Sequence, residues 1–120
     1  MTRRNLEIYR GDTYPFTVTV TNGGNPVNIS GMKFRMTAKY AIADTDANAV
    51  FTITSPVNIV LTNATNGLIT VTIPPSATTG LQSRVYRLAY DIQAYNDANT
   101  IYTVCSGFLI VNPDVSTTAP

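Results

Sequence analysis

The sequence of 120 residues contains no histidine and no tryptophan, and cysteine occurs only once, at Cys105. Without histidine, the chain lacks the commonest general base, the commonest metal ligand and every catalytic triad that depends on imidazole. A single cysteine excludes an internal disulfide. Because Cys105 lies within the apolar run 101–111, we interpret it as a small buried hydrophobic residue, with an inter-chain disulfide or a reactive thiol as the alternative. These absences predict that the protein is not an enzyme and needs no cofactor.

Charged residues are also scarce, at 12% of the chain against about 25% in a typical soluble domain. Eight lysines and arginines against seven acidic residues give a net charge of +1. So small a net charge predicts no direct binding to nucleic acid or to an anionic membrane. The sequence has no apolar run of about 18 residues and no signal-peptide pattern, so we expect no membrane span and synthesis in a cytoplasm.

Acidic residues are too few and too scattered to predict a metal site. Only Asp44 and Asp46 lie close together in the sequence, and calcium needs about six or more oxygen ligands, several of them anionic. We therefore interpret 41–48 as a solvent-exposed loop, with calcium binding as the weaker alternative. The only glutamate, Glu7, and the aspartates in turns do not predict the facing carboxylates of a glycosidase.

What the sequence does contain is a period of two, in which apolar and polar side chains alternate as they do along a half-buried strand. Segment 14–20 alternates aromatic and aliphatic residues mostly with threonines, and 68–73 shows a similar alternation before Pro74-Pro75 ends it. Asn- and Gly-containing turns separate several of the segments. After a short first strand, the predicted strands are 14–20, 26–29, 32–40, 51–53, 57–61, 68–73, 84–95 and 100–111.

Seven or eight short strands at roughly ten-residue spacing, with no helix long enough to connect parallel strands, predict an all-β antiparallel sandwich. The immunoglobulin-like version fits best, because Tyr86 lies near the start of the penultimate strand, where such folds place a tyrosine corner. We expect one domain over 1–111 with a short N-terminal arm, followed by a flexible polar tail over 112–120.

Alternation also predicts which side chains face the core. One helical turn is expected at 76–81, with Ser76 as N-cap, Gly80 as terminator and Leu81 in the core. Residues 96–99 should form a tight hairpin, and Tyr9 and Tyr95 should face outward. The side chains predicted to face inward include Tyr14, Phe34, Met36, Tyr40, Tyr86, Tyr90, Ile92, Tyr102, Val104, Phe108 and Ile110.

Three short motifs have simple local interpretations. Arg10-Gly11-Asp12 matches the integrin-binding tripeptide, but it lies where the first strand must turn into the second, so we interpret it as a turn. The sequons at Asn28 and Asn63 carry meaning only on a secretory route, and their side chains are expected to form hydrogen bonds within turns.

Lys33, Arg35 and Lys39 form a basic stripe along one face of a predicted strand, with Arg84 and Arg87 as candidate neighbours. Pairing of this stripe with Asp91, and with Glu7, across adjacent strands is the simpler interpretation. An interface to an acidic partner is the alternative.

The segment 8–20 is followed by Gly24-Asn25-Pro26-Val27-Asn28-Ile29-Ser30-Gly31 and then by the strand with alternating basic residues. Together with 67–73, 74–81 and 85–92, this plan resembles small immunoglobulin-like virion domains of tailed bacteriophages. It is similar to the N-terminal domain of baseplate upper proteins and to free-standing capsid decoration proteins, over nearly the whole chain up to Val111.

The resemblance implies a non-enzymatic structural protein of the phage virion, made in the cytoplasm of the host bacterium. Because the sequence stops nine residues after its last predicted strand, we expect a free-standing part. The first interpretation is a capsid decoration or cement protein that docks on the major capsid protein. The alternatives are a tail or baseplate adaptor, and a carbohydrate- or cell-surface-binding module with Tyr9, Tyr95 and the loop 44–48 as contacts.

The expected assembly is a homo-oligomer, for which a trimer is one candidate form. Edge strands and both chain ends are the surfaces expected to contact the partner virion protein. The candidate interface residues are Arg3, Arg4, Lys33, Arg35, Lys39, Pro113 and Val115.

Overall fold

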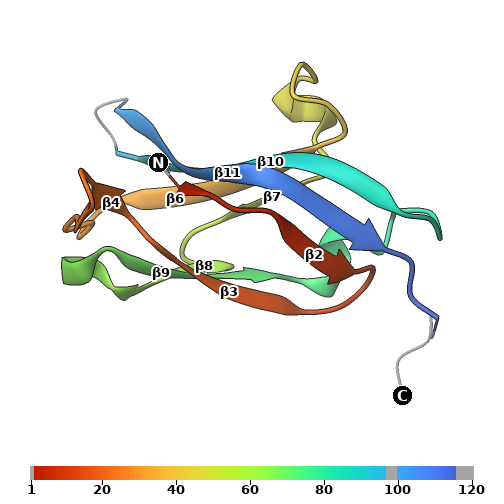
Figure 1. The fold of residues 1–120 in the computed structure, drawn as a ribbon, viewed down its shortest axis with the longest axis horizontal. Helices are drawn as coiled ribbons and strands as arrows, with labels where there is room; N and C mark the ends of the chain where they lie inside the picture. Colours follow the sequence, from red (N-terminus) through yellow and green to blue (C-terminus); the bar gives the residue numbers. More distant parts are fainter. Residues whose placement is uncertain (1, 97–99, 116–120) are drawn as a thin grey trace.

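A computed structural model describes residues 2–96 and 100–115. In this part of the chain the strands form two facing layers (Figure 1). One layer is a six-stranded sheet and the other a three-stranded sheet, and a separate two-stranded hairpin lies at one end. The predicted all-β sandwich is confirmed.

The described elements follow the predicted order closely. The strands are β1 (Thr2–Arg3), β2 (Leu6–Tyr9), β3 (Tyr14–Thr19), β4 (Thr21–Asn22), β5 (Asn25–Pro26), β6 (Lys33–Lys39), β7 (Phe51–Thr54), β8 (Ile59–Asn63), β9 (Leu68–Ile73), β10 (Tyr86–Tyr95) and β11 (Ile101–Asn112). Three short 3-10 helices are η1 (Asp46–Asn48), η2 (Ala64–Asn66) and η3 (Pro75–Ala77).

The sheet order is that of an immunoglobulin-like sandwich. The six-stranded sheet has the order β1-β11-β10-β6-β7, with β2 also paired to β11, and the three-stranded sheet has the order β3-β9-β8. Strands β10, β11 and β6 correspond to the F, G and C strands of such domains, and β3, β9 and β8 correspond to B, E and D. β1 and β2 run parallel to β11, whereas the other pairs are antiparallel.

Strand β9 illustrates how the sequence forms these layers. Its bounds match the predicted segment, and Ile69, Val71 and Ile73 alternate with half-exposed residues and are fully buried. The proline pair that follows cannot donate to a sheet, so the strand ends there. In the six-stranded sheet, Phe34, Met36, Leu88 and Ile92 are among the buried side chains of the shared core.

Strand β11 differs from the prediction because it contains a bulge. Ile92 lies opposite Cys105 and Gln93 opposite Thr103, which leaves Val104 as an extra residue. Val104 and Cys105 are therefore both buried although they are adjacent. The bulge reverses the alternation that follows, so the prediction that Phe108 and Ile110 face inward is wrong. Leu109 and Val111 are buried in their place.

Other differences arise at strand ends. Tyr40 and Tyr102 were predicted to face the core, but each is 55% exposed. Tyr40 comes just after β6 ends, and Tyr102 lies near the start of β11. Strand β8 begins two residues later than predicted, and Val57, expected in that strand, is exposed.

The predicted helical turn is present in a different register. The 3-10 turn η3 spans Pro75–Ala77 with Pro74 as its N-cap residue and Thr78 as its C-cap, so Ser76 and Gly80 do not have the predicted roles. Leu81 is buried, as predicted. The tip of the predicted 96–99 hairpin, residues 97–99, lies outside the described residues.

The predicted tyrosine corner is confirmed. The backbone N–H of Gln82 donates a hydrogen bond to the Tyr86 hydroxyl at 3.1 Å, and this tyrosine begins β10. The bond fixes the segment before β10 against the start of that strand, as in other immunoglobulin-like folds. The Arg84 side chain lies 4.8 Å from the centre of the Tyr86 ring, and its hydrogen bond lowers the pKa of the hydroxyl.

The segment expected to be an N-terminal arm lies along β11. Arg4 donates its backbone N–H to Ser106 at 2.9 Å, and the Asn5 side chain accepts from the Phe108 N–H at 3.0 Å. A Cβ atom at Gly107 would collide with the Arg4 carbonyl, so glycine is needed for this close approach. The Tyr90 hydroxyl donates to the same carbonyl.

No helix among the described residues is long and apolar enough to cross a membrane.

Candidate functional site

A hollow of about 510 Å³ lies on the outer face of the six-stranded sheet. Small or short side chains form its floor: Ala89 and Asp91 on β10, Thr37 on β6 and Ser106 on β11. Asp91 lies opposite both Thr37 and Ser106, so the lowest part of the floor runs across three strands. Longer side chains surround it, from Arg3, Arg35, Lys39, Ile42, Ile101 and Phe108. The difference in side-chain length creates the hollow.

The two β6 cations that line the hollow, Arg35 and Lys39, each have a partner beside it. Arg35 donates from Nη2 to Oε1 of Gln93 at 2.7 Å. Lys39 donates to the backbone carbonyl of Asp44 at 2.8 Å and forms an ion pair with Asp46, also at 2.8 Å. Lys39 thereby fastens the loop between β6 and β7 to the strand.

Asp91 is the acidic group on the floor. Burial raises the pKa of its carboxyl, and the nearby positive charges of Arg35 and Lys39 oppose that rise. Asp91 therefore lies within electrostatic range of Arg35 and Lys39, but these two cations form hydrogen bonds and an ion pair with Gln93, Asp44 and Asp46. Glu7 is not beside the basic stripe, because Glu7 lies on β2 and accepts a hydrogen bond from the Asn112 side chain at 2.9 Å.

An apolar rim accompanies these charges. Ile42, Ile101 and Phe108 are 80%, 56% and 37% exposed, and they come from the β6–β7 loop and from both halves of β11. The Arg87 guanidinium lies 3.9 Å from the centre of the Phe108 ring. Phe108 belongs to this rim because the bulge at Val104 turned it outward. The signal in the sequence was the adjacent pair Val104-Cys105, which breaks strict alternation.

The hollow brings together three of the predicted interface residues, Arg3, Arg35 and Lys39. Lys33 lies at the start of the same strand, opposite Tyr95. Arg4 turns toward the other sheet, where it donates to the Thr17 carbonyl at 2.8 Å.

The remaining two predicted residues, Pro113 and Val115, follow the end of β11, and Val115 is fully exposed. The two tyrosines expected in a carbohydrate-binding module do not lie close together. Tyr9 pairs with Asn112 near the Tyr86 end of β10, whereas Tyr95 is at its other end, about 30 Å away at the usual rise per residue.

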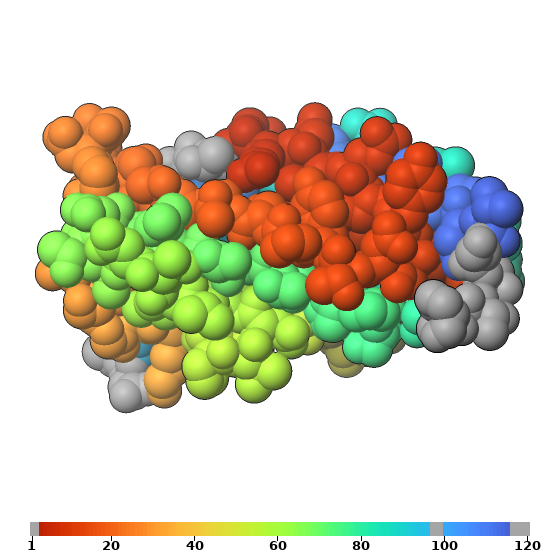
Figure 2. Space-filling model, turned by 90° about the horizontal axis from the view of Figure 1, so that it is seen from below, coloured from red at the N-terminus to blue at the C-terminus, as the bar shows by residue number. Residues whose placement is uncertain are grey.

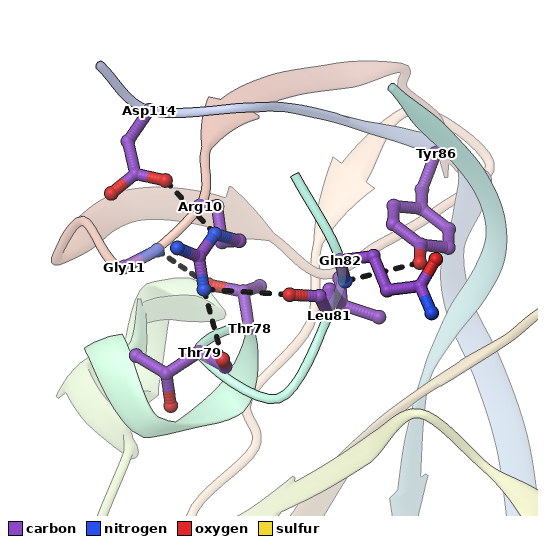
Figure 3. Close-up of polar contacts among 8 residues, drawn as sticks. All are labelled: Arg10, Gly11, Thr78, Thr79, Leu81, Gln82, Tyr86 and Asp114. Atoms are coloured by element: carbon purple, nitrogen blue, oxygen red, sulfur yellow. Dashed lines mark hydrogen bonds and ion pairs between the residues drawn. The ribbon is translucent and has the colours of Figure 1, made fainter. Parts of the chain in front are cut away.

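The Arg10-Gly11-Asp12 turn is a structural junction (Figure 3). Arg10 forms an ion pair with Asp114 at 2.9 Å and donates to the carbonyl of Thr79 at 2.9 Å. Gly11, at a φ of 81°, donates its N–H to the buried hydroxyl of Thr78 at 2.8 Å. The interpretation as a turn is confirmed, and Asp114 shows that the start of the 112–120 segment is fastened to the domain.

The other sequence candidates also have local partners. Asp44 accepts from the N–H of Ala41 at 3.1 Å, and the bond from Lys39 lowers the pKa of Asp46. Within 2–96 and 100–115, no three potential metal-ligating side chains come together. Asn28 accepts from the N–H and the hydroxyl of Ser30, as expected for a turn. Cys105 is fully buried, and burial raises the pKa of its thiol.

Known proteins resemble this chain in structure but not in sequence. No protein-family model matches the sequence, and no curated protein matches it. The N-terminal domain of phage TP901-1 ORF48 is similar in structure with a TM-score of 0.55 and 12% identity, over 93% of this chain and 99% of that domain. This chain shares its fold with that phage domain.

A 2,6-sialyltransferase from Photobacterium sp. JT-ISH-224 also aligns, at 12% identity over 94% of this chain. The chain spans only 18% of that enzyme, and the TM-score is 0.35. This second likeness therefore carries no weight for function.

Proposed function

We propose that this chain is a non-enzymatic structural domain of a bacteriophage virion, which docks on other virion proteins. The observation that carries the proposal is the shared fold with the TP901-1 domain, because the two match over nearly their full lengths. The outer-face hollow supports it, since it combines exposed apolar and cationic side chains as protein interfaces do.

Two placements in the particle follow. As a capsid decoration protein the domain binds the major capsid protein at the shell surface, and as a tail or baseplate adaptor it joins tail components. The sequence resemblance supports both, and the match to the N-terminal domain of phage TP901-1 ORF48 is compatible with either placement. Either role is compatible with a homo-oligomer, which light scattering on the purified protein measures directly.

Binding to separated virion parts tests the proposal. Purified protein is mixed with DNA-filled heads and with isolated tails of the source phage, and bound copies are quantified after sedimentation. Binding to heads alone assigns decoration, and binding to tails alone assigns the adaptor role. An unrelated immunoglobulin-like domain of similar size controls for nonspecific retention. Binding to neither part would sink the proposed function.

A further inference from the structure

We propose that the outer-face hollow binds an extended segment of a partner virion protein that presents both acidic and apolar side chains on one face. The inference rests on the proposed function and adds the surface and the chemistry of its partner. It depends on two observations, the positive charge around the hollow and the apolar side chains on its rim.

Charge favours an acidic partner. Three cationic residues, Arg3, Arg35 and Lys39, border the hollow, and Arg87 lies beside it against Phe108. Two carboxylates share this surface, Asp46, which is paired with Lys39, and Asp91 on the floor, so the four cations outnumber the acidic groups and leave a positive net charge. An Arg side chain has five N–H donors, and the bond from Arg35 to Gln93 uses one of them.

The apolar rim favours a peptide over a small anion. Ile42 and Ile101 are more than half exposed, and Phe108 presents its ring on the same face. A small anion would contact the cations and leave these side chains in water. An extended segment with acidic and apolar residues two positions apart would cover both, because side chains at i and i+2 project from the same face of an extended chain.

A synthetic probe tests the chemistry directly. A short capped peptide that repeats Glu-Ser-Val-Ser, so that glutamate and valine share one face when it is extended, is titrated into isotope-labelled protein. Matched peptides in which glutamine or lysine replaces glutamate are the controls. We expect amide shifts confined to the outer face of β6, β10 and β11, and binding of the glutamate peptide about fivefold to tenfold tighter than that of the glutamine peptide. Equal binding of the two, or no shift with the glutamate peptide, overturns the proposal.

Two variants locate the site. R35Q and K39Q should each weaken the glutamate peptide about threefold to fivefold, whereas R84Q removes the same charge outside the hollow and should leave affinity unchanged. Thermal unfolding of each variant shows that the domain is intact. An equal loss in R84Q would reduce the effect to net charge and overturn the assignment of the hollow.

Other occupants give different results. If sodium acetate or inorganic phosphate produces the same shifts at the same concentration, the hollow is a small-anion site. If the protein self-associates and R35Q abolishes that association, the occupant is a second copy of this chain. Either result overturns the proposal of a partner segment.

Binding of the variants to phage heads and tails tests this inference separately from the proposed function. Should the wild-type protein bind heads or tails while R35Q and K39Q bind equally well, the function stands and the hollow is not its docking surface. Loss of binding in R35Q and K39Q but not in R84Q supports both.

Discussion

The two sheets of the sandwich have similar inner faces and very different outer faces. Strands β3, β8 and β9 form much of the face seen in Figure 2. They contain no charged residue, and their outward side chains are mainly threonines. The six-stranded sheet contains all the charged side chains that lie on strands of the sandwich: Arg3, Glu7, Lys33, Arg35, Lys39, Arg87 and Asp91. In both sheets the apolar side chains alternate toward the core. The two sheets therefore differ in the side chains that their outer faces offer to a partner.

The sheets also differ in how they are held. The three-stranded sheet relies on fully buried Ile59, Ile69 and Val71. The six-stranded sheet has an additional fastening at its edge, where the first residues of the chain pair with β11 over Gly107 and receive the hydrogen bond of Tyr90. Burial raises the pKa of this tyrosine, so its hydroxyl stays protonated and able to donate at neutral pH. The sheet with the more varied outer face is therefore also the sheet whose edge is held by specific polar contacts.

The largest effect is expected from Gly107→Ala. The new methyl group would meet the Arg4 carbonyl, so the first strand must shift away from β11, and we expect unfolding to become easier by about 2 to 3 kcal/mol. Chemical denaturation measures this change. Gly80→Ala is the matched control, because a Cβ there meets no atom within 4 Å. If both variants lose the same stability, the edge fastening is unimportant.

The tyrosine corner should give the next largest effect. Tyr86→Phe removes the acceptor for the Gln82 N–H and the partner of Arg84, and we expect a loss of about 1 to 1.5 kcal/mol in the free energy of unfolding. Tyr102→Phe removes the hydroxyl of an exposed tyrosine on the same sheet and should be neutral. Equal stability of Tyr86→Phe and wild type would show that the corner does not stabilise the fold.

The apolar rim allows a direct comparison of the two outer faces. Phe108→Ser on β11 and Val60→Ser on β8 each remove an exposed apolar side chain, one from each sheet. We expect Phe108→Ser to weaken binding to the virion part about fivefold, and Val60→Ser to leave it unchanged. Sedimentation with heads and tails gives the affinities. The reverse result would move the docking surface to the three-stranded sheet.

The sequence predicted the layers better than it predicted this surface. Strand β9 was predicted to the residue because its alternation is strict and a proline pair ends it. Tyr86 was identified because its role depends on a local hydrogen bond, between residues only four apart in the sequence. The hollow joins Arg3, Lys39 and Phe108, and it depends on the parallel pairing of the first strand and on a bulge. The pairing leaves no period in the sequence, and the bulge leaves only the adjacent apolar pair Val104-Cys105. Arg3, Arg35 and Lys39 were therefore predicted as interface residues, whereas Phe108 was not.

The smallest effect concerns the charge on the floor of the hollow. Because burial raises the pKa of Asp91, the folded protein binds this proton more tightly than the unfolded chain does. Stability therefore falls as pH rises from the unfolded value, about 3.9, through the folded pKa, and a constant penalty remains above it. Asp91→Asn removes that penalty. We expect the variant to be more stable at pH 7 by less than about 0.5 kcal/mol, since Asp91 is partly exposed and its charge is screened.

The pH dependence of stability distinguishes the penalty for the Asp91 charge from a change in packing. The gain in Asp91→Asn should disappear below about pH 3, where the carboxyl is protonated in both states. Asp46→Asn is the control of opposite sign, because Lys39 lowers the pKa of that exposed group and its removal should slightly destabilise the protein at pH 7. Asp91→Asn should also bind the glutamate peptide more tightly, since the floor then repels the ligand less. A gain in stability that persists at low pH would show that the penalty does not come from the charge.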